Sequence, residues 1–405
     1  MNTTTDIRDA SWLRSIACLS TSRADAGIYR PLLEALARSS RWEVTCLAAG
    51  THTEGEFGRT IADFEDLRGV RITPVSHHQA GDSPEAVSAS AGRGIIEVSK
   101  ALSQGRADIL FVLGDRTEML AGSLAGLIHG MPICHLHGGD VTQGAYDDQC
   151  RHAISMLAHL HFPALAAHGE RLASMGEERW RIHSVGAMAL DGLRTFAPEP
   201  IESLNAEMGL DFRRPTMIVV FHPETLAALT AERQVTEVLA ALEGFEGNIL
   251  VIGPNADVGH RSIQSAFLRF TASRPGAKLF ASLTQRRFWS CLAHAQVLMG
   301  NSSAGILEAA SFRLPVVNVG ARQEGRLRAG NVIDAPVERR AIADALCRAV
   351  DPSFRASLAN LTNPYGDGRA AERIIEVLER LPDRQTLIRK GWARNEQQAA
   401  AADRQ

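Results

Sequence analysis

Short apolar runs alternate with longer helix-like patterns along most of this chain, and this alternation constrains the fold more than any other feature. The first series of runs is RSIACLS, EVTCLAA, ADILFVLG, MPICHLHG and RIHSVG. Such near-continuous apolar runs are typical of strands that helices cover on both faces. The pattern therefore predicts an α/β fold with parallel sheets.

A second series of strand-like runs follows: TMIVVFHP, GNILVIGPN, AKLFA, AQVLMGN and LPVVNVG. A chain of 405 residues exceeds the size at which one hydrophobic core keeps growing. We therefore expect two doubly wound, Rossmann-like domains, residues 1–195 and 215–382, facing each other across a cleft. The segment 196–214 contains prolines and lacks a strand pattern, which indicates a linker.

The C-terminal region contains one further helical pattern, GRAAERIIEVLERL, which is a candidate to cross back towards the first domain. Residues 383–405 are expected to form a tail. Their last part, ARNEQQAAAADRQ, is low in bulky apolar side chains, which predicts a frayed helix or a disordered end.

Charge and cysteine usage limit the classes of partner. The formal net charge of −3 is too small to favour nucleic acid or an anionic membrane. The polar start, MNTTTDIRDASW, is neither a signal peptide nor a membrane anchor, and no apolar run reaches the length of a membrane-spanning helix. The six cysteines include no CxxC pair and lie mostly in apolar contexts. We expect a cytoplasmic protein that binds neither nucleic acid nor membrane.

Polar motifs follow the predicted strands at their carboxyl ends. In the first half these are TSRADAG, GDRTE and HGGD, and in the second half they are FHPET, GPNADVG, GNSSAG and GARQEGR. Ligands of doubly wound sheets bind outside the carboxyl ends of the strands. The series therefore predicts an active site between the two domains.

The segment GNSSAGILE is the strongest candidate for binding phosphate. Ser302, Ser303, Ala304 and Gly305 open a helix after a strand, where small residues let backbone amides approach an anion. A serine that only caps the helix is the alternative. Glu308, one turn further, could accept hydrogen bonds from ribose hydroxyls. The chain contains neither GxGxxG nor a Walker motif, which disfavours a standard dinucleotide or ATP site.

Other candidate ligand-binding residues stand in loops after strands. Arg23 and Arg322 could clamp a diphosphate from opposite domains, although a solvated surface arginine is the alternative. Asn255 and Asp257 lie in a tight turn, where such residues are also common for local reasons. His222 follows four apolar strand residues and is expected to point into the cleft, unless a neighbouring carbonyl satisfies it.

The stretch HLHGGDVTQGAYDDQCRH gathers histidines and aspartates in one short segment. His135 and His137 alternate along a strand and would share a face, as a metal pair does. Asp140, Asp147 and Asp148 could add oxygens, so metal ligation stays an alternative to hydrogen bonding. Asp148 suits the start of a helix, where the helix dipole alone would explain it.

Together these motifs resemble the hydrolysing UDP-N-acetylglucosamine 2-epimerases of the sialic acid and nonulosonate branch. The matching segments TSRADAG, LGDRTE, HGGD…YDDQCRHAI, FHPET, GPNADVG, GNSSAGILE, GARQEGR and NPYGDGRAAERI run in family order through nearly the whole chain. The resemblance implies a GT-B fold, UDP held mainly by the second domain, no cofactor, and a homodimer or a dimer-based tetramer. Two acids depart from common versions of the motifs, since Asp25 and Asp140 stand where many members carry glutamate.

The family chemistry implies roles for particular residues. A base removes the C2 proton of UDP-N-acetylglucosamine while UDP leaves C1, and water then adds to the 2-acetamidoglycal to release N-acetylmannosamine. By resemblance, the residues with catalytic roles are Asp115, Asp140, Asp147 and His222. The positions implied to hold UDP are Arg23, Arg116, Ser302, Ser303, Glu308 and Arg322.

Alternatives to this function stay open at the level of sequence. The shorter acids could accommodate a differently substituted sugar, and UDP-2,4-diacetamido-2,4,6-trideoxyglucose, on the legionaminic acid route, is the leading alternative. A non-hydrolysing epimerase, a GT-B UDP-sugar glycosyltransferase and a non-catalytic nucleotide-sugar sensor are the other hypotheses. The sensor hypothesis expects the acids at positions 115, 140 and 147 to be lost, and they are present.

Overall fold

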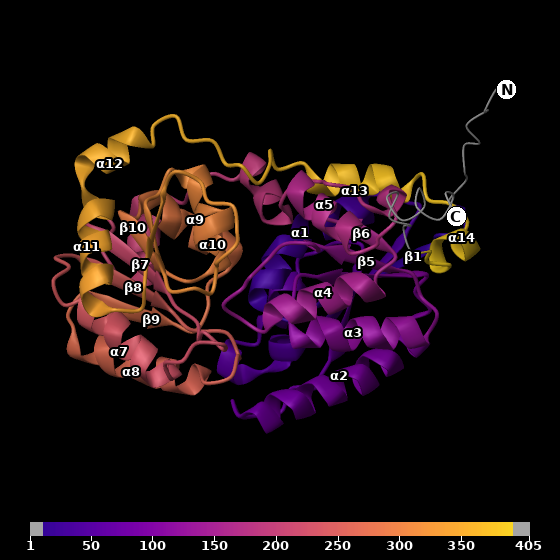
Figure 1. The fold of residues 1–405 in the computed structure, drawn as a ribbon, viewed down its shortest axis with the longest axis horizontal. Helices are drawn as coiled ribbons and strands as arrows, with labels where there is room; N and C mark the ends of the chain where they lie inside the picture. Colours follow the sequence, from indigo (N-terminus) through magenta and orange to yellow (C-terminus); the bar gives the residue numbers. More distant parts are fainter. Residues whose placement is uncertain (1–10, 392–405) are drawn as a thin grey trace, which may run out of the picture.

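Two parallel sheets, one in each half of the chain, form the framework of the computed structural model, which describes residues 11–391. Figure 1 shows them as two lobes lying side by side. The first sheet consists of β1 (Ser15–Ser20), β2 (Glu43–Ala49), β3 (Val70–Val75), β4 (Ile109–Leu113), β5 (Ile133–Leu136) and β6 (Leu160–Phe162). The second consists of β7 (Thr216–Val220), β8 (Asn248–Ile252), β9 (Ala277–Phe280), β10 (Val297–Gly300), β11 (Val316–Val319) and β12 (Val332–Ala335).

Both sheets have the same topology. Their strand orders are β3-β2-β1-β4-β5-β6 and β12-β11-β10-β7-β8-β9, so each chain path starts in the middle, runs to one edge and returns to the other. The direction reverses between β1 and β4, where Cys18 pairs with Phe111, and between β7 and β10, where Val220 pairs with Gly300. These are the switch points at which doubly wound sheets bind ligands. The predicted fold class is confirmed.

Helices cover both faces of each sheet. The helices of the first half are α1 (Arg23–Arg38), α2 (Pro84–Gly105), α3 (Thr117–Ile128), α4 (Asp147–Leu157), α5 (Ala166–Ser174) and α6 (Ile201–Met208). Those that follow are α7 (Ala231–Ala241), α8 (His260–Ser273), α9 (Gln285–His294), α10 (Ser303–Leu307), α11 (Arg339–Val350), α12 (Pro352–Ser357), α13 (Ala370–Leu378) and α14 (Arg384–Ile388). α2, α3 and α4 pack side by side, whereas α1 packs on α13. Right-handed crossovers place these two groups on opposite faces.

Short 3₁₀ helices complete the framework: η1 (Gly50–Thr53), η2 (Gly55–Phe57), η3 (Thr60–Phe64), η4 (Arg179–Arg181), η5 (Met188–Thr195) and η6 (Ala309–Phe312). The first three follow β2 and form the loop that approaches the second lobe. This loop makes its contact where the ring of Phe57 lies 5.8 Å from that of His260.

One predicted strand is wrong, and three short strands were missed. The run RIHSVG starts at the last residue of η4 and forms only a single bridge between Ile182 and His161, because the sixth strand is the preceding Leu160–Phe162. The other missed strands are β3 and β12, which lie at sheet edges and contain Pro74 and Asp334. Edge strands tolerate such residues, so their sequences lack the continuous apolar pattern.

The chain crosses between the lobes twice. Leu204 and Met208 of α6 pack in the core of the second lobe, close to the end of η5. After α12 the chain returns, and Ile374 and Leu378 of α13 are buried in the core of the first lobe. Figure 1 shows this return as the long connection from α12 to α13. The predicted C-terminal helix, α13, therefore belongs to the core of the first lobe and not to that of the second.

The expectations for the two ends of the chain concern residues 1–10 and 392–405, which lie outside the described residues. Between them, no helix is long and apolar enough to cross a membrane.

We predict that Gly300→Ala destabilises the protein. Gly300 has φ = 137°, and a Cβ there would lie 2.0 Å from the carbonyl oxygen of Val220 on the neighbouring strand. Backbone strain together with this collision should cost about 2 kcal/mol or more and lower Tm by several degrees in a thermal unfolding scan. Gly244→Ala is the matched control, because a Cβ at Gly244 meets no atom within 4 Å. An equal Tm for both variants would contradict the prediction.

Candidate active site

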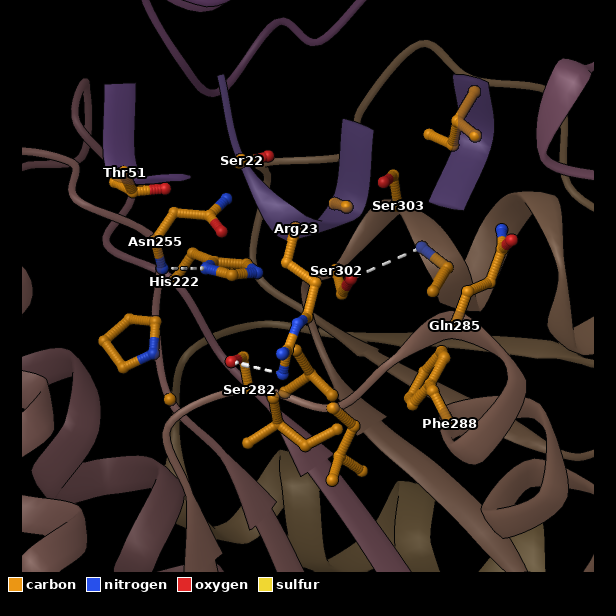
Figure 2. A pocket seen from close by; sticks show the side chains of 18 of the residues that line it. Ser22, Arg23, Thr51, His222, Asn255, Ser282, Gln285, Phe288, Ser302 and Ser303 are labelled. Carbon is orange, nitrogen blue, oxygen red and sulfur yellow. Dashed lines mark hydrogen bonds between the residues drawn. The ribbon is translucent and has the colours of Figure 1, made fainter. Parts of the chain in front are cut away.

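The turn between β1 and α1 brings Arg23 to the cleft. The carboxylate of Asp25 shapes this turn by accepting hydrogen bonds from the amide (2.9 Å) and hydroxyl (2.7 Å) of Thr21 and from the next amide (3.0 Å). This capping box begins α1. The guanidinium of Arg23 then donates to Asp63 through Nε (2.7 Å) and to the hydroxyl of Ser282 in the second lobe through Nη1 (2.7 Å; Figure 2).

The turn between β4 and α3, at the switch point of the first sheet, carries Asp115 and Arg116. The carboxylate of Asp115 accepts a hydrogen bond from the buried guanidinium of Arg151 on α4. The Arg116 guanidinium lies 3.5 Å from Glu118 and 3.8 Å from Asp257, and its buried Nε has no hydrogen-bond partner. An unsatisfied buried donor next to a cavity is suited to an anionic ligand.

Asp147, the first residue of α4, has the most perturbed carboxyl group of the acidic cluster. Burial raises its pKa to about 7, and the charges of Asp115 and Asp257 add to this effect, while Arg322 and Arg116 oppose it. A carboxyl group with a pKa near neutrality can both take and give a proton at physiological pH. Asp147 therefore has the protonation behaviour of a general base or acid.

Asp140 lies in the loop that leads into α4, and its environment differs from that of Asp147. Burial disfavours its charge, but Arg326, Arg151 and His168 outweigh this effect and lower its pKa to about 2. Its carboxylate pairs with Arg326 of the second lobe (2.9 Å) and with His168 (3.2 Å). Asp148, in contrast, accepts from the amide of Thr142 (2.6 Å) and holds the loop.

In the second lobe His222 follows β7, at the second switch point. The backbone amide of Asn255 donates to its Nδ1 (3.1 Å), so the proton of the neutral ring is on Nε2 (Figure 2). Burial and the charges of Arg322 and Arg116 hold the pKa of His222 well below its ordinary value. The ring is a neutral donor. The side chain of Asn301 fixes the backbone here by donating to the His222 carbonyl (2.9 Å) and accepting from its amide (2.7 Å).

Arg322 enters the cleft from the loop after β11. Its amide donates to Glu224 (3.1 Å) and its Nη1 donates to the carbonyl of Asn301 (3.2 Å), which orients the guanidinium. Its buried Nε has no hydrogen-bond partner, and its Nη2 lies 3.9 Å from Asp147. This contact brings a cation of the second lobe next to an acid of the first.

The small residues after β10 have divided roles. The hydroxyl of Ser302 accepts from the amide of Ala304 (3.3 Å) and caps α10, and Ser302, Ser303 and Ala304 line the cavity (Figure 2). Gly305 faces inwards instead, where a Cβ would lie 3.0 Å from Cγ1 of Val316. Its role is close packing of α10 on the sheet.

Glu308 also lines the cavity. Its carboxylate accepts a hydrogen bond from Nε1 of Trp289 (2.6 Å). Burial raises its pKa to about 7, against the hydrogen bonds from Trp289 and Gln285. An acceptor held at this position is suited to hydroxyl donors of a ligand.

A cavity of about 1200 Å³, measured to its open mouth, lies between the lobes. Nine of the predicted residues line it: Arg23, Arg116, His222, Asn255, Ser302, Ser303, Ala304, Glu308 and Arg322.

Five predicted residues do not line this cavity. Asp257 lies 3.8 Å from Arg116 and Asp147 lies 3.9 Å from Arg322, two arginines that line the cavity, and Asp115 is near Asp147. Asp140 is paired between the lobes and Gly305 packs in the core. The catalytic role of Asp140 stays a prediction.

Several lining residues were missed in the sequence. They include Thr51 and Phe57 after β2, and Ser282, Gln285 and Phe288 after β9. The segment ASLTQ follows the predicted strand AKLFA, so the rule of polar carboxyl ends could have found Ser282 and Gln285. Phe57 carries no such signal, because a lone aromatic residue in a loop has many explanations.

The alternative of a metal site is not supported by the geometry. Among residues 11–391, no group of three or more His, Cys, Asp or Glu side chains is arranged to hold a metal ion. Both ring nitrogens of His135 are hydrogen-bonded, to Gly114 and Ser155, and Nε2 of His137 accepts from the amide of Met188 (3.2 Å).

The geometry defines the class of protein: two doubly wound lobes with a cation-lined cavity between their switch points, as in GT-B proteins. The family model described as UDP-N-acetylglucosamine 2-epimerase matches residues 34–379. The chain therefore belongs to the UDP-N-acetylglucosamine 2-epimerase family, and the resemblance seen in its motifs is confirmed.

Two relatives and one solved structure illustrate this membership. The chain is 32% identical over 383 residues to a UDP-N,N'-diacetylbacillosamine 2-epimerase (hydrolyzing) of Legionella pneumophila, covering 93% of this chain and 99% of that protein. It is also 32% identical to a UDP-N-acetylglucosamine 2-epimerase of Neisseria meningitidis serogroup B, covering 90% and 95%. The fold matches the crystal structure of UDP-GlcNAc 2-epimerase from Neisseria meningitidis bound to UDP-GlcNAc, with a TM-score of 0.75, 16% identity and coverage of 89% and 98%.

We predict that Asp147→Asn stabilises the folded protein at neutral pH. Because the pKa of Asp147 is raised to about 7, the carboxyl group stabilises the fold only while protonated, and this contribution is lost as pH rises to that value. Asparagine cannot ionise, so the variant avoids this loss of stability. Its Tm should equal that of the wild type below pH ~4, exceed it by an increasing amount up to pH ~7, and exceed it by a constant amount above that pH. Asp148→Asn is the control and should show no gain, because its carboxylate is paired with a backbone amide. A gain that does not change with pH would contradict the prediction.

Proposed function

We propose that this protein is a hydrolysing 2-epimerase, which converts UDP-N-acetylglucosamine and water to N-acetylmannosamine and UDP. The observation that carries the proposal is the contact between Asp147 and Arg322, 3.9 Å apart across the cleft. The chemistry needs a proton acceptor at C2 next to a cation at the diphosphate on C1, and these carbons are bonded to each other. Membership of the epimerase family supports the same chemistry.

In the first step, a carboxylate of the Asp115–Asp147 pair takes the C2 proton. The electrons of the C–H bond form the C1–C2 double bond, and the C1–O bond breaks, releasing UDP. Arg116 and Arg322 would neutralise the departing diphosphate, and the Nε2–H group of His222 would donate to it. The product is a 2-acetamidoglycal.

In the second step, water adds to C1 and a proton returns to C2 on the opposite face. The two faces of C2 require two proton carriers, which fits two carboxyl groups in different environments. Arg151 donates a hydrogen bond to Asp115, whereas burial favours the protonated form of Asp147. With a pKa near 7, Asp147 can serve on either side of this exchange, and Asp115 is the second carboxyl group of the pair.

A second substrate is favoured by a specific observation. The Legionella pneumophila relative, and another from Campylobacter jejuni, are named as hydrolysing epimerases of UDP-activated or GDP/UDP-activated N,N'-diacetylbacillosamine. This sugar is the 2,4-diacetamido-2,4,6-trideoxyglucose considered above, and its C2 chemistry is the same. We therefore retain UDP-N,N'-diacetylbacillosamine as the alternative substrate.

The first experiment is proton NMR of the purified protein with each UDP-sugar in deuterated water. The expected products are UDP and the free 2-epimer with deuterium at C2, from one of the two substrates. UDP without C2 exchange would indicate simple hydrolysis, and the UDP-linked epimer would indicate a non-hydrolysing enzyme. Transfer of the sugar to an added acceptor would indicate a glycosyltransferase, and inertness towards both sugars would indicate a sensor. Each of these results would overturn the proposal.

We predict that Asp147→Asn lowers kcat for the preferred sugar by about 10² to 10⁴, because proton transfer at C2 loses its carrier. The dissociation constant of UDP, measured by calorimetry, should change little, because the proposed role of Asp147 is at C2 of the sugar and not at the nucleotide. Glu170→Gln is the control, since Glu170 pairs with Arg179 on the surface. An Asp147→Asn enzyme with wild-type kcat would exclude this residue from the reaction.

A further inference from the structure

His135 lies on β5 behind the cleft, and the proposed chemistry gives it no role. Its ring is fully buried, with Nε2 2.7 Å from the carbonyl oxygen of Gly114 and Nδ1 3.0 Å from the hydroxyl of Ser155. A carbonyl oxygen can only accept, so Nε2 carries the proton and Nδ1 accepts from Ser155. The two partners therefore define one neutral tautomer.

These partners belong to the two elements that carry the proposed proton carriers. Gly114, with φ = 72°, directly precedes Asp115 in the turn after β4. Ser155 lies about two turns along α4 from Asp147. His135 therefore bridges the turn that presents one carboxylate and the helix that presents the other. Arg151 of the same helix makes a second tie, directly to Asp115.

The packing around the bridge leaves little freedom. A Cβ at Gly138 would lie 2.8 Å from Nδ1 of His135 and 3.0 Å from the hydroxyl of Ser155. The glycine allows the ring and the helix to meet at hydrogen-bond distance. The imidazole fills the space between turn and helix and fixes their separation.

We propose that His135 is a positioning residue for the epimerase reaction, holding the turn that bears Asp115 and the helix that bears Asp147 at the separation that the C2 chemistry needs. The inference rests on the proposed function. His135 is buried and does not line the cavity, so its loss should affect the rate and not the binding of UDP-sugar. A misplacement of about 1 Å can cost about 100-fold in rate.

The experiment compares three variants of the site with the wild type. His135→Leu removes both hydrogen bonds in a side chain of similar size, and kcat should fall by about 100-fold with KM within about twofold. His135→Gln keeps a donor that can reach the Gly114 carbonyl, and it should recover kcat to within about tenfold of the wild type. Ser155→Ala removes only the second bond and should lie between them.

A matched control exists elsewhere on the molecule. Nε2 of His129 and the hydroxyl of Ser99 form an exposed histidine–serine hydrogen bond (2.8 Å) between α3 and α2. Ser99→Ala should leave kcat and KM unchanged. Thermal unfolding of every variant reports whether it is folded at the assay temperature, and Ser155→Ala and His135→Gln keep the test available if His135→Leu fails to fold.

The outcomes separate the two proposals. A fall in kcat together with an equal rise in KM would indicate that His135 only packs in the core. A kcat of His135→Gln no higher than that of His135→Leu would indicate the same. Either result would overturn this inference and leave the proposed function standing. Unchanged kcat in all three variants would do the same. A wild-type enzyme that releases no epimerised sugar from either substrate would overturn the proposed function, and this inference with it.

Discussion

The carboxyl ends of two parallel sheets face one cleft, and every group in the candidate site depends on this arrangement. Asp115 and Arg116 follow β4, and His222 follows β7, so each comes from a switch point of its sheet. The crossovers run in opposite directions on either side of a switch point, which leaves open backbone there. Neither lobe alone assembles the site, because the cavity is lined by Arg23 and Arg116 of the first lobe and by His222 and Arg322 of the second.

Electrostatic coupling across the cleft gives the acids different protonation behaviour. Asp140 is held ionised by Arg326, whereas burial beside Asp115 favours the protonated form of Asp147. The same protein thus keeps one carboxylate ionised as an interlobe ion pair and holds another near its protonation midpoint at neutral pH. The arginines that would receive the diphosphate also moderate the repulsion among the acids, because Arg116 and Arg322 both oppose the rise in the pKa of Asp147. Ionised Asp147 is buried near other negative charges, so its ionisation lowers the free energy of unfolding.

Much of the site could be predicted from sequence because a single rule, polar residues after apolar strands, applies to both halves. It identified Arg23, His222 and Ser302, all of which line the cavity. It did not separate Gly305, which packs against the sheet, from its neighbours, because a glycine for close packing and one for phosphate contact look the same in sequence. Phe57 and Ser282 were missed because their contribution arises only when a loop of one lobe meets the other.

The sequence by itself determined the class of fold and the positions of most of its strands, because apolar periodicity is a local property that burial in a covered sheet requires. It also determined the family, through motifs that are written in consecutive residues. The tertiary structure alone decided which acids face which cations. The pairing of Asp140 with Arg326 and the contact of Asp147 with Arg322 join residues of different lobes. Protonation depends on burial and on the distances between such charges, and neither is encoded in spacing along the chain.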